Sequence, residues 1–145
     1  MRYMIIVKAT AETEAETGIQ TPDEALIKAM TDYHEQLAQA GVLLDGSGLK
    51  PSRVGWRITF AETGGSEDRR TITDGPFAET KELIAGYTLI QVRSREEALE
   101  WTRRFPNPVS LGRAAAIEVR ELYELDDFAP SESLDRLREM GVGGA

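Results

Sequence analysis

The chain of 145 residues has no cysteine and a single histidine, His34. Disulfides, thiolate nucleophiles and cysteine metal sites are therefore excluded, and one histidine is too few for a histidine-rich zinc or iron site. The chain also lacks a phosphate-binding glycine loop, a Gly-x-Ser-x-Gly elbow and a dinucleotide fingerprint, so we expect neither a metal nor another cofactor. The absence of cysteine fits a reducing compartment, and we expect a cytoplasmic protein.

Long apolar runs and an excess of basic charge are missing as well. No segment approaches the roughly 20 apolar residues that span a bilayer, and the N-terminus has no signal-peptide cleavage pattern. Acidic residues outnumber basic ones by 25 to 17, which gives a net charge of −8 at pH 7. This balance argues against nonspecific binding to nucleic acid or to anionic membranes. At this length we expect one soluble domain with a sizeable core and neither of those partners.

Helix caps and apolar spacing predict two long helices. The first helix is predicted to begin at Thr21 and Pro22, which provide an N-cap, a proline in the first turn and a capping box. Gly41 occupies the position that is favoured just after a helix end. The second helix begins at Ser94, again with a capping box, and stops at residues 107–108, where Asn-Pro follows.

Apolar and alternating segments predict the strands, and polar segments between them predict the connections. The glycines within residues 42–51 indicate a bulge, or a close approach of another backbone or of a ligand. The resulting order of elements predicts an α+β fold with both helices on one face of an antiparallel sheet. Strands are expected at residues 2–8, 42–51, 54–61, 69–73, 86–92 and 115–122, exposed connections at 9–20 and 63–68, and one helical turn at 79–84.

Because both helices cover one face of the sheet, its other face must meet water or a partner. That face combines large apolar residues with polar ones, as a dimer interface or an enclosed cavity requires. We therefore expect a homodimer packed through the sheets, with residues 1–128 as the domain and 129–145 as a C-terminal tail. The polar residues expected on this face are Arg57, Thr59, Tyr87, Gln91, Glu118 and Arg120.

The segment Asp74-Gly75-Pro76-Phe77 is the nearest feature to a chemical signature in this chain. An aspartate at a chain reversal usually accepts a hydrogen bond from the backbone N–H two residues on, but Pro76 has no N–H. The Asp74 carboxylate must therefore reach the Phe77 N–H, find another partner, or stay available. It is either a general acid or base, or a carboxylate that stabilises the turn.

His34 lies on the apolar side of the first predicted helix, between Met30 and Leu37. Its unperturbed pKa near 6.5 suits a proton shuttle. A single histidine on an apolar helix face is also typical of a core residue whose ring nitrogens are satisfied by hydrogen bonds. Both interpretations stay open from the sequence.

Five stretches of the chain match a pattern known from one family. They are Met1–Met4, Ala40–Leu43 with Gly46–Leu49, Thr73–Glu82, Glu96–Trp101 and Ile117–Arg120. Together they resemble the YCII-related family, in its DGPF-domain branch, over roughly residues 1–128. The resemblance implies a ferredoxin-like sandwich that forms a dimeric α+β barrel. Members of the wider family are regarded as small enzymes with a His–Asp pair in a cleft, so the resemblance implies such an activity for this chain. DGPF members often accompany sigma factors, so it also implies a link to sigma-factor pathways.

Two hypotheses from different classes follow. In the first, a small cofactor-independent enzyme uses Asp74 and His34 as catalytic residues and moves a proton on a small organic substrate. In the second, a non-enzymatic dimer binds a small ligand or acts as a regulatory module linked to sigma-factor pathways. The candidate ligand-binding residues are Gly75, Pro76, Phe77, Arg57, Tyr87 and Arg120.

Overall fold

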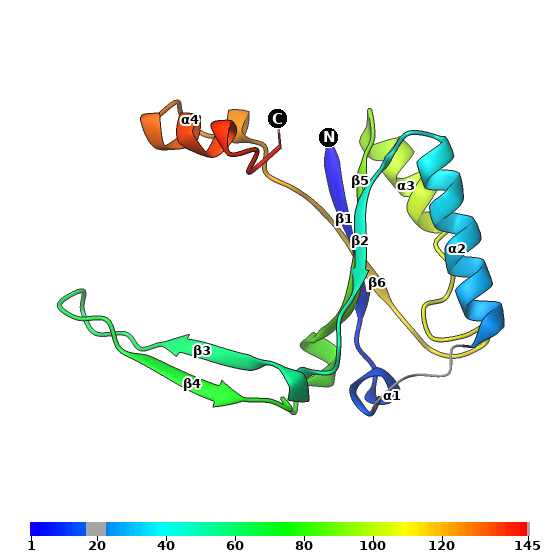
Figure 1. Ribbon diagram of the computed structural model, residues 1–145, viewed down its shortest axis with the longest axis horizontal. Coiled ribbons are helices and arrows are strands. Elements are labelled where there is room, and N and C mark those ends of the chain that lie inside the picture. Colours follow the sequence, from blue (N-terminus) through cyan, green and yellow to red (C-terminus); the bar gives the residue numbers. More distant parts are fainter. Residues whose placement is uncertain (17–22, 145) are drawn as a thin grey trace.

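The computed structural model describes residues 1–16 and 23–144 (Figure 1). The strands in this part of the chain are β1 (Arg2–Lys8), β2 (Leu43–Gly48), β3 (Trp56–Phe60), β4 (Arg70–Asp74), β5 (Ile84–Gln91) and β6 (Ile117–Glu121). The α-helices are α1 (Ala11–Glu14), α2 (Glu24–Gln39), α3 (Arg95–Arg103) and α4 (Glu132–Glu139). Single turns of 3-10 helix lie at Ser52–Val54, Thr80–Glu82 and Leu125–Asp127, the second of them within the predicted helical turn.

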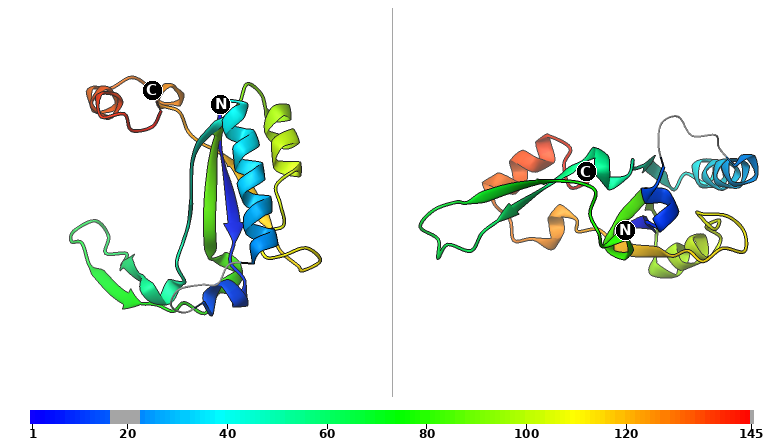
Figure 2. Two further views of the ribbon diagram at one scale, coloured as in Figure 1. Left: turned by 45° about the vertical axis from the view of Figure 1, so that its right-hand side comes forward. Right: turned by 90° about the horizontal axis from the view of Figure 1, so that it is seen from below.

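Four of the strands form an antiparallel sheet in the order β2-β5-β1-β6. Helices α2 and α3 lie side by side on one face of this sheet, and its other face is not covered by a helix layer (Figures 1 and 2). The predicted α+β class is therefore confirmed. The pairing of β2 with β5 shifts register between Leu43 and Asp45, an irregularity within the segment 42–51 where the sequence indicated either a bulge or a close approach.

The uncovered side of the sheet carries a mixed set of side chains, which we call the open face. In β5, Thr88 and Ile90 are buried under the helices, so the alternating residues between and around them point the other way. Residues opposite each other in an antiparallel pair share a face, which extends the assignment to β1 and β6. The open face comprises Met4, Ile6, Tyr87, Leu89, Gln91, Glu118 and Arg120.

The prediction that Arg57 and Thr59 share this face is wrong. Within the described part of the chain, strands β3 and β4 pair with each other and with no other strand, and they form a separate two-stranded sheet. This hairpin projects away from the main sheet on the side opposite to the helices (Figures 1 and 2). The alternation within β3 was sufficient to predict a strand, but it contains no information about which sheet the strand joins.

The ends of the helices follow local capping chemistry. In α2 the Asp23 carboxylate accepts hydrogen bonds from the N–H groups of Ala25 and Leu26, so the N-cap of this helix lies two residues after the predicted one. The predicted cap residues Thr21 and Pro22 lie outside the described residues. Gly41, with φ of +73°, follows the end of α2 as predicted.

Residues 11–14 form α1, so the predicted loop at 9–20 is wrong in that part. The hydroxyls of Thr10 and Thr13 each accept a hydrogen bond from the backbone N–H of the other, and this reciprocal cap stabilises a single helical turn. Residues 17–20 of the predicted loop lie outside the described residues.

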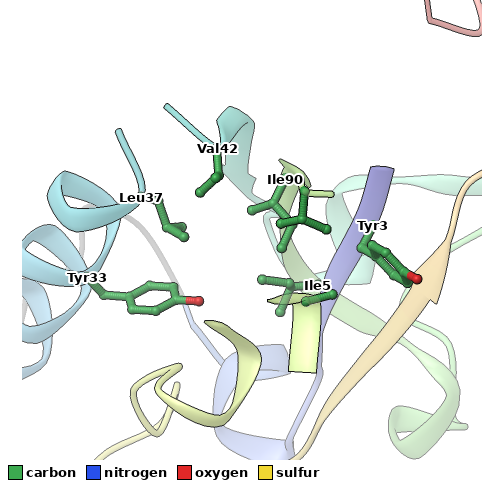
Figure 3. Packing of buried hydrophobic residues seen from close by; sticks show 8 residues of the cluster. Tyr3, Ile5, Tyr33, Leu37, Val42 and Ile90 are labelled. Atoms are coloured by element: carbon green, nitrogen blue, oxygen red, sulfur yellow. The ribbon is translucent and has the colours of Figure 1, made fainter. Parts of the chain in front are cut away.

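The hydrophobic core lies between the sheet and its two helices (Figure 3). Burial raises the pKa of the Tyr33 hydroxyl to about 12. This hydroxyl donates to the Trp101 carbonyl oxygen at 2.8 Å and thereby connects α2 to α3. The buried residues of the core are Tyr3, Ile5, Tyr33, Leu37, Val42, Ile90, Val92 and Ala98.

The segment that follows β6 turns toward the open side of the sheet and carries α4 (Figure 1). The Arg2 guanidinium binds Glu124 through two hydrogen bonds of 2.9 and 3.0 Å, which fix the start of this segment to β1. The hairpin and the α4 segment thus both extend from the side of the open face, at opposite ends of the sheet. No helix in the described part of the chain has both the length and the apolar character needed to cross a membrane.

Candidate functional site

Asp74 is the last residue of β4 and lies opposite Trp56 of β3. Its side chain is exposed, and no hydrogen bond or ion pair to its carboxylate is found among residues 1–16 and 23–144. The Phe77 N–H, the alternative partner suggested by the sequence, donates instead to Ser52 Oγ at 3.0 Å. Of the three outcomes that the sequence left open for this carboxylate, the structure has the third, a carboxylate that stays available.

The rest of the Asp-Gly-Pro-Phe segment is held by contacts within the chain. The Glu14 carboxylate accepts hydrogen bonds from the Ser52 N–H, at 3.0 Å, and from the Ser52 hydroxyl. Gly75 packs so closely on Ser52 that a Cβ atom at this position would lie 1.9 Å from the Ser52 carbonyl oxygen. The Arg57 guanidinium lies over the Phe77 ring, 4.0 Å from its centroid. These contacts tie the base of the hairpin to α1 and to the turn at residues 52–54.

His34 lies elsewhere, on the side of α2 that faces the sheet. Its Nδ1 is 2.7 Å from the Met30 carbonyl oxygen and its Nε2 is 2.8 Å from Thr88 Oγ1. A carbonyl oxygen only accepts, so the hydrogen-bond partners assign the proton of the neutral ring to Nδ1. The Nε2 lone pair then accepts a hydrogen bond from the Thr88 hydroxyl. Thr88 is only 3% exposed, so this hydrogen bond is shielded from water.

A cavity of about 820 Å³ lies beside this pair, between α2 and the strands β2 and β5. Gly46 of β2 lines it next to the two polar groups. A Cβ atom at Gly46 would lie 3.6 Å from Thr88 Oγ1 and 3.7 Å from His34 Nε2, so a larger side chain there would cover the pair. The wall is apolar at Met30, Leu43 and Phe105 and also includes Asp45, Ser47 and Tyr87.

The single chain does not bring the two predicted catalytic residues together. Both ring nitrogens of His34 are engaged by Met30 and Thr88, and Asp74 does not line the cavity beside them. The predicted ligand-binding residues are also divided. Arg57, Gly75, Pro76 and Phe77 lie at the base of the hairpin, whereas Tyr87 and Arg120 lie on the open face.

The two residues on the open face make polar contacts of their own. The Tyr87 hydroxyl donates to the Asp45 carboxylate at 2.9 Å. The Arg120 guanidinium lies 3.6 Å from the Glu118 carboxylate, and both side chains are largely exposed. Of the predicted ligand-binding residues, Tyr87 alone is among those that line the His34 cavity, where β5 passes it, although its side chain points to the open face. Among the described residues, no group of three or more histidine, aspartate or glutamate side chains is placed to hold a metal ion.

Sequence reasoning missed Thr88 and did not single out Gly46. Thr88 had a signal, because it is a polar residue between Gly86 and Ile90 in the buried half of an alternating strand. A polar side chain in that position needs a hydrogen-bond partner, and His34 is the partner that the fold supplies. Gly46 was covered only by the general expectation of a close approach near residues 42–51.

The fold and the site define a small α+β protein with a four-stranded antiparallel sheet, a projecting hairpin and a cavity lined by His34. The sequence model of the YCII-related domain matches residues 1–126, and the chain belongs to the YCII-related family. It is also similar to an uncharacterised protein of Rhizobium meliloti (strain 1021), with 32% identity over 85 residues. That match covers 59% of this chain and 64% of the relative, so the chain spans less than two thirds of that protein.

Proposed function

We propose that this protein binds a small organic molecule in the cavity beside His34 and moves a proton on it without a cofactor. The observation that carries this proposal is the His34–Thr88 hydrogen bond of 2.8 Å in the wall of a cavity of about 820 Å³. Pockets of this size suit drug-sized or smaller molecules, and an apolar wall with a few polar groups is typical of such sites. The apolar lining favours an aromatic or aliphatic body, and the polar pair favours a hydroxyl or carbonyl group on it.

The two side chains form a relay for one proton. A ligand proton passes to Thr88 Oγ1 while the Thr88 hydroxyl proton passes to His34 Nε2, which leaves an imidazolium and a deprotonated ligand. The Nδ1–H continues to donate to the Met30 carbonyl oxygen, so the ring keeps its orientation during the transfer. Return of the proton to a different ligand atom completes an isomerisation, and loss of a leaving group completes an elimination.

Binding is tested with catechol as the probe, because it combines an aromatic body with hydroxyl groups. His34 is the single histidine, so its ring signals in NMR spectra report on the site without overlap. We expect saturable shifts of the His34 ring signals in the wild type and in Gly48→Ala, where a methyl group meets no atom within 4 Å. In Gly46→Leu the affinity is expected to fall at least about tenfold, because the leucine covers the pair. Equal binding by both glycine variants would contradict the proposed site.

Proton transfer is tested separately with Thr88→Val, which replaces the hydroxyl by a methyl group of similar size. Small phenyl ketones in D₂O exchange their α-hydrogens when a base acts on them, and NMR measures the rate. We expect the wild type to accelerate this exchange and Thr88→Val to lose most of the acceleration while binding changes little. Acceleration that survives in Thr88→Val would contradict the relay.

Asp74 is the second candidate for acid–base chemistry, favoured by its exposed carboxylate without a partner among the described residues. Asp74→Asn separates the two sites, because it should leave binding in the His34 cavity unchanged. Loss of binding or of exchange in this variant would move the proposed site to the base of the hairpin. A non-enzymatic ligand-binding or regulatory module is favoured by the complete hydrogen bonding of the His34 ring. Binding of catechol with no exchange in any ketone would support it.

We also propose that the functional unit is a homodimer in which two ferredoxin-like sandwiches of the DGPF branch pack through their open faces. The order β1-α2-β2-β5-α3-β6 in the main sheet supports the sandwich. The surface area supports the dimer: the chain exposes 10515 Å², whereas a compact monomer of 16.0 kDa exposes about 7,400 Å². The excess of about 3,000 Å² is surface of the kind that an obligate dimer buries.

Sedimentation equilibrium tests the homodimer by comparing two variants. Leu89→Glu places a charge on the open face, and Thr31→Glu places the same charge on α2, on the other side of the sheet. Leu89 lies on the open face, and the exposed Thr31 lies on α2. We expect dimers at micromolar concentration for the wild type and for Thr31→Glu, and a shift toward monomer for Leu89→Glu. A wild type that stays monomeric at millimolar concentration would contradict the dimer.

A further inference from the structure

The hairpin of β3 and β4 has one apolar face and one polar face. In its register Ile58 lies opposite Ile72, and Thr59 lies opposite Thr71. Since opposite residues share a face and neighbours along a strand alternate, these two pairs point in opposite directions. The first of these faces carries Trp56, Ile58, Phe60 and Ile72, with Arg70 opposite Phe60 and Asp74 opposite Trp56 at its two ends. The Arg70 guanidinium lies over the Phe60 ring, 4.7 Å from its centroid. We call this face the apolar face, and the hairpin of residues 56–74 the hairpin arm.

All four apolar side chains of this face are exposed in the single chain. Their exposed fractions are 64% for Trp56, 42% for Ile58, 61% for Phe60 and 68% for Ile72. The arm projects beyond the main sheet, and no layer formed by the described residues lies over both strands (Figures 1 and 2). A two-stranded hairpin is marginally stable at best in water, so an arm of this length with an apolar face requires a cover.

We propose that the apolar face of the hairpin arm packs on a second copy of this chain, so that each copy of the homodimer holds its partner with its arm. This inference rests on the homodimer proposed above and assigns part of its interface. The surface area that must be buried indicates that a second copy of this chain covers the apolar face of the arm. A sheet-to-sheet contact of standard size removes about 800 Å² from each chain, which leaves most of the excess surface of about 3,000 Å² exposed. The apolar face of the arm, with four large side chains that are each at least 42% exposed, is part of the surface that remains.

The geometry also suits a two-fold arrangement. The arm extends from the same side as the open face, so a partner seated on that face lies next to the arm (Figure 1). In a two-fold dimer every contact occurs twice. The arm of the first chain packs on a surface of the second chain, and the arm of the second chain packs on the same surface of the first. The turn that precedes the arm is tied to α1 by the Glu14–Ser52 hydrogen bonds, and the segment that follows the arm is tied to the same turn by the hydrogen bond from the Phe77 N–H to Ser52 Oγ.

Two neighbouring residues of β4 provide a matched test. Ile72→Glu places a charge on the apolar face, and Thr71→Glu places the same charge on the polar face one residue earlier. Both positions are exposed in the single chain. We expect sedimentation equilibrium to give wild-type dimers for Thr71→Glu and a dissociation constant at least about 30-fold higher for Ile72→Glu. Circular dichroism checks that both variants are folded.

Cysteine labelling keeps the test decisive if Ile72→Glu does not fold. The chain has no cysteine, so Ile72→Cys and Thr71→Cys each carry one thiol. In the dimer we expect a maleimide to label Ile72→Cys at least about tenfold more slowly than Thr71→Cys, because a buried thiol is inaccessible. Equal labelling rates in a dimer, or equal dimerisation of the two glutamate variants, would overturn the arm contact and leave the open-face dimer standing. A monomeric wild type would overturn both the arm contact and the open-face dimer. Protection of residue 72 only in the presence of a different protein would overturn the arm contact alone.

Discussion

Gly75→Ala is expected to lower the free energy of unfolding by about 3 kcal/mol or more and to loosen the base of the hairpin arm. A Cβ atom at Gly75 would lie 1.9 Å from the carbonyl oxygen of Ser52 and 2.5 Å from its carbonyl carbon. Both are backbone atoms, so no side-chain rotation relieves the overlap. The chain can only separate the two segments, which breaks the hydrogen bond from the Phe77 N–H to Ser52 Oγ.

Gly55→Ala is the matched control for this prediction. Gly55 accepts the hydrogen bond from the Gly75 N–H at 3.0 Å, and a Cβ atom there would lie 3.7 Å from the same Ser52 oxygen, which is an ordinary contact. We expect Gly55→Ala to change stability by less than about 0.5 kcal/mol. Urea unfolding measures both variants, and hydrogen exchange at the residue 75 amide reports on the base of the arm. If Gly75→Ala keeps wild-type stability and amide protection, the close contact with Ser52 does not exist.

The two main helices were the most predictable part of the fold, because their signals are local. Gly41 ends α2 and Ser94 begins α3, as their immediate neighbours in the sequence indicated. The start of α2 differs because Asp23 also caps well, and its carboxylate reaches two backbone N–H groups. Within a few residues, several capping residues compete, and small differences in geometry decide among them.

The destination of the hairpin could not be predicted in the same way. Alternation of Trp56, Ile58 and Phe60 predicts a strand with one apolar face, and that much is correct. The same alternation arises whether the apolar face covers its own core or meets a partner. Only the pairing of strands distinguishes these cases, and pairing depends on residues far apart in the sequence.

The candidate site shows the same limit at the level of single residues. Position on the apolar stripe placed His34 on the inner side of α2, which the structure bears out, but its partner Thr88 is 54 residues away. For Asp74 the local turn argument correctly removed Pro76 as a donor. It could not foresee that Ser52, 25 residues before Phe77, would take the Phe77 N–H. Local chemistry thus identified both groups, while the partners of His34 and of the Phe77 N–H depended on the tertiary fold.

Leu37→Ala is expected to lower the free energy of unfolding by about 3–4 kcal/mol. Leu37 is fully buried and packs in the cluster with Tyr33, Val42 and Ile90 (Figure 3). Truncation removes three side-chain carbons from this cluster and leaves a cavity that the sheet and α3 cannot fill. Ile27→Ala on the same helix is the control, because Ile27 is 47% exposed and should cost less than about 1 kcal/mol.

Urea unfolding at several protein concentrations separates this core from the proposed dimer interface. Leu37 lies in the core of one chain, whereas Leu89 points away from that core on the open face. The loss in Leu37→Ala should therefore be the same at every concentration, and the loss in Leu89→Glu should vary with concentration because it acts through dimer dissociation. A loss below about 1 kcal/mol in Leu37→Ala would mean that α2 does not pack on the sheet at this residue. Concentration-dependent loss in Leu37→Ala would mean that the core and the dimer interface unfold as one unit.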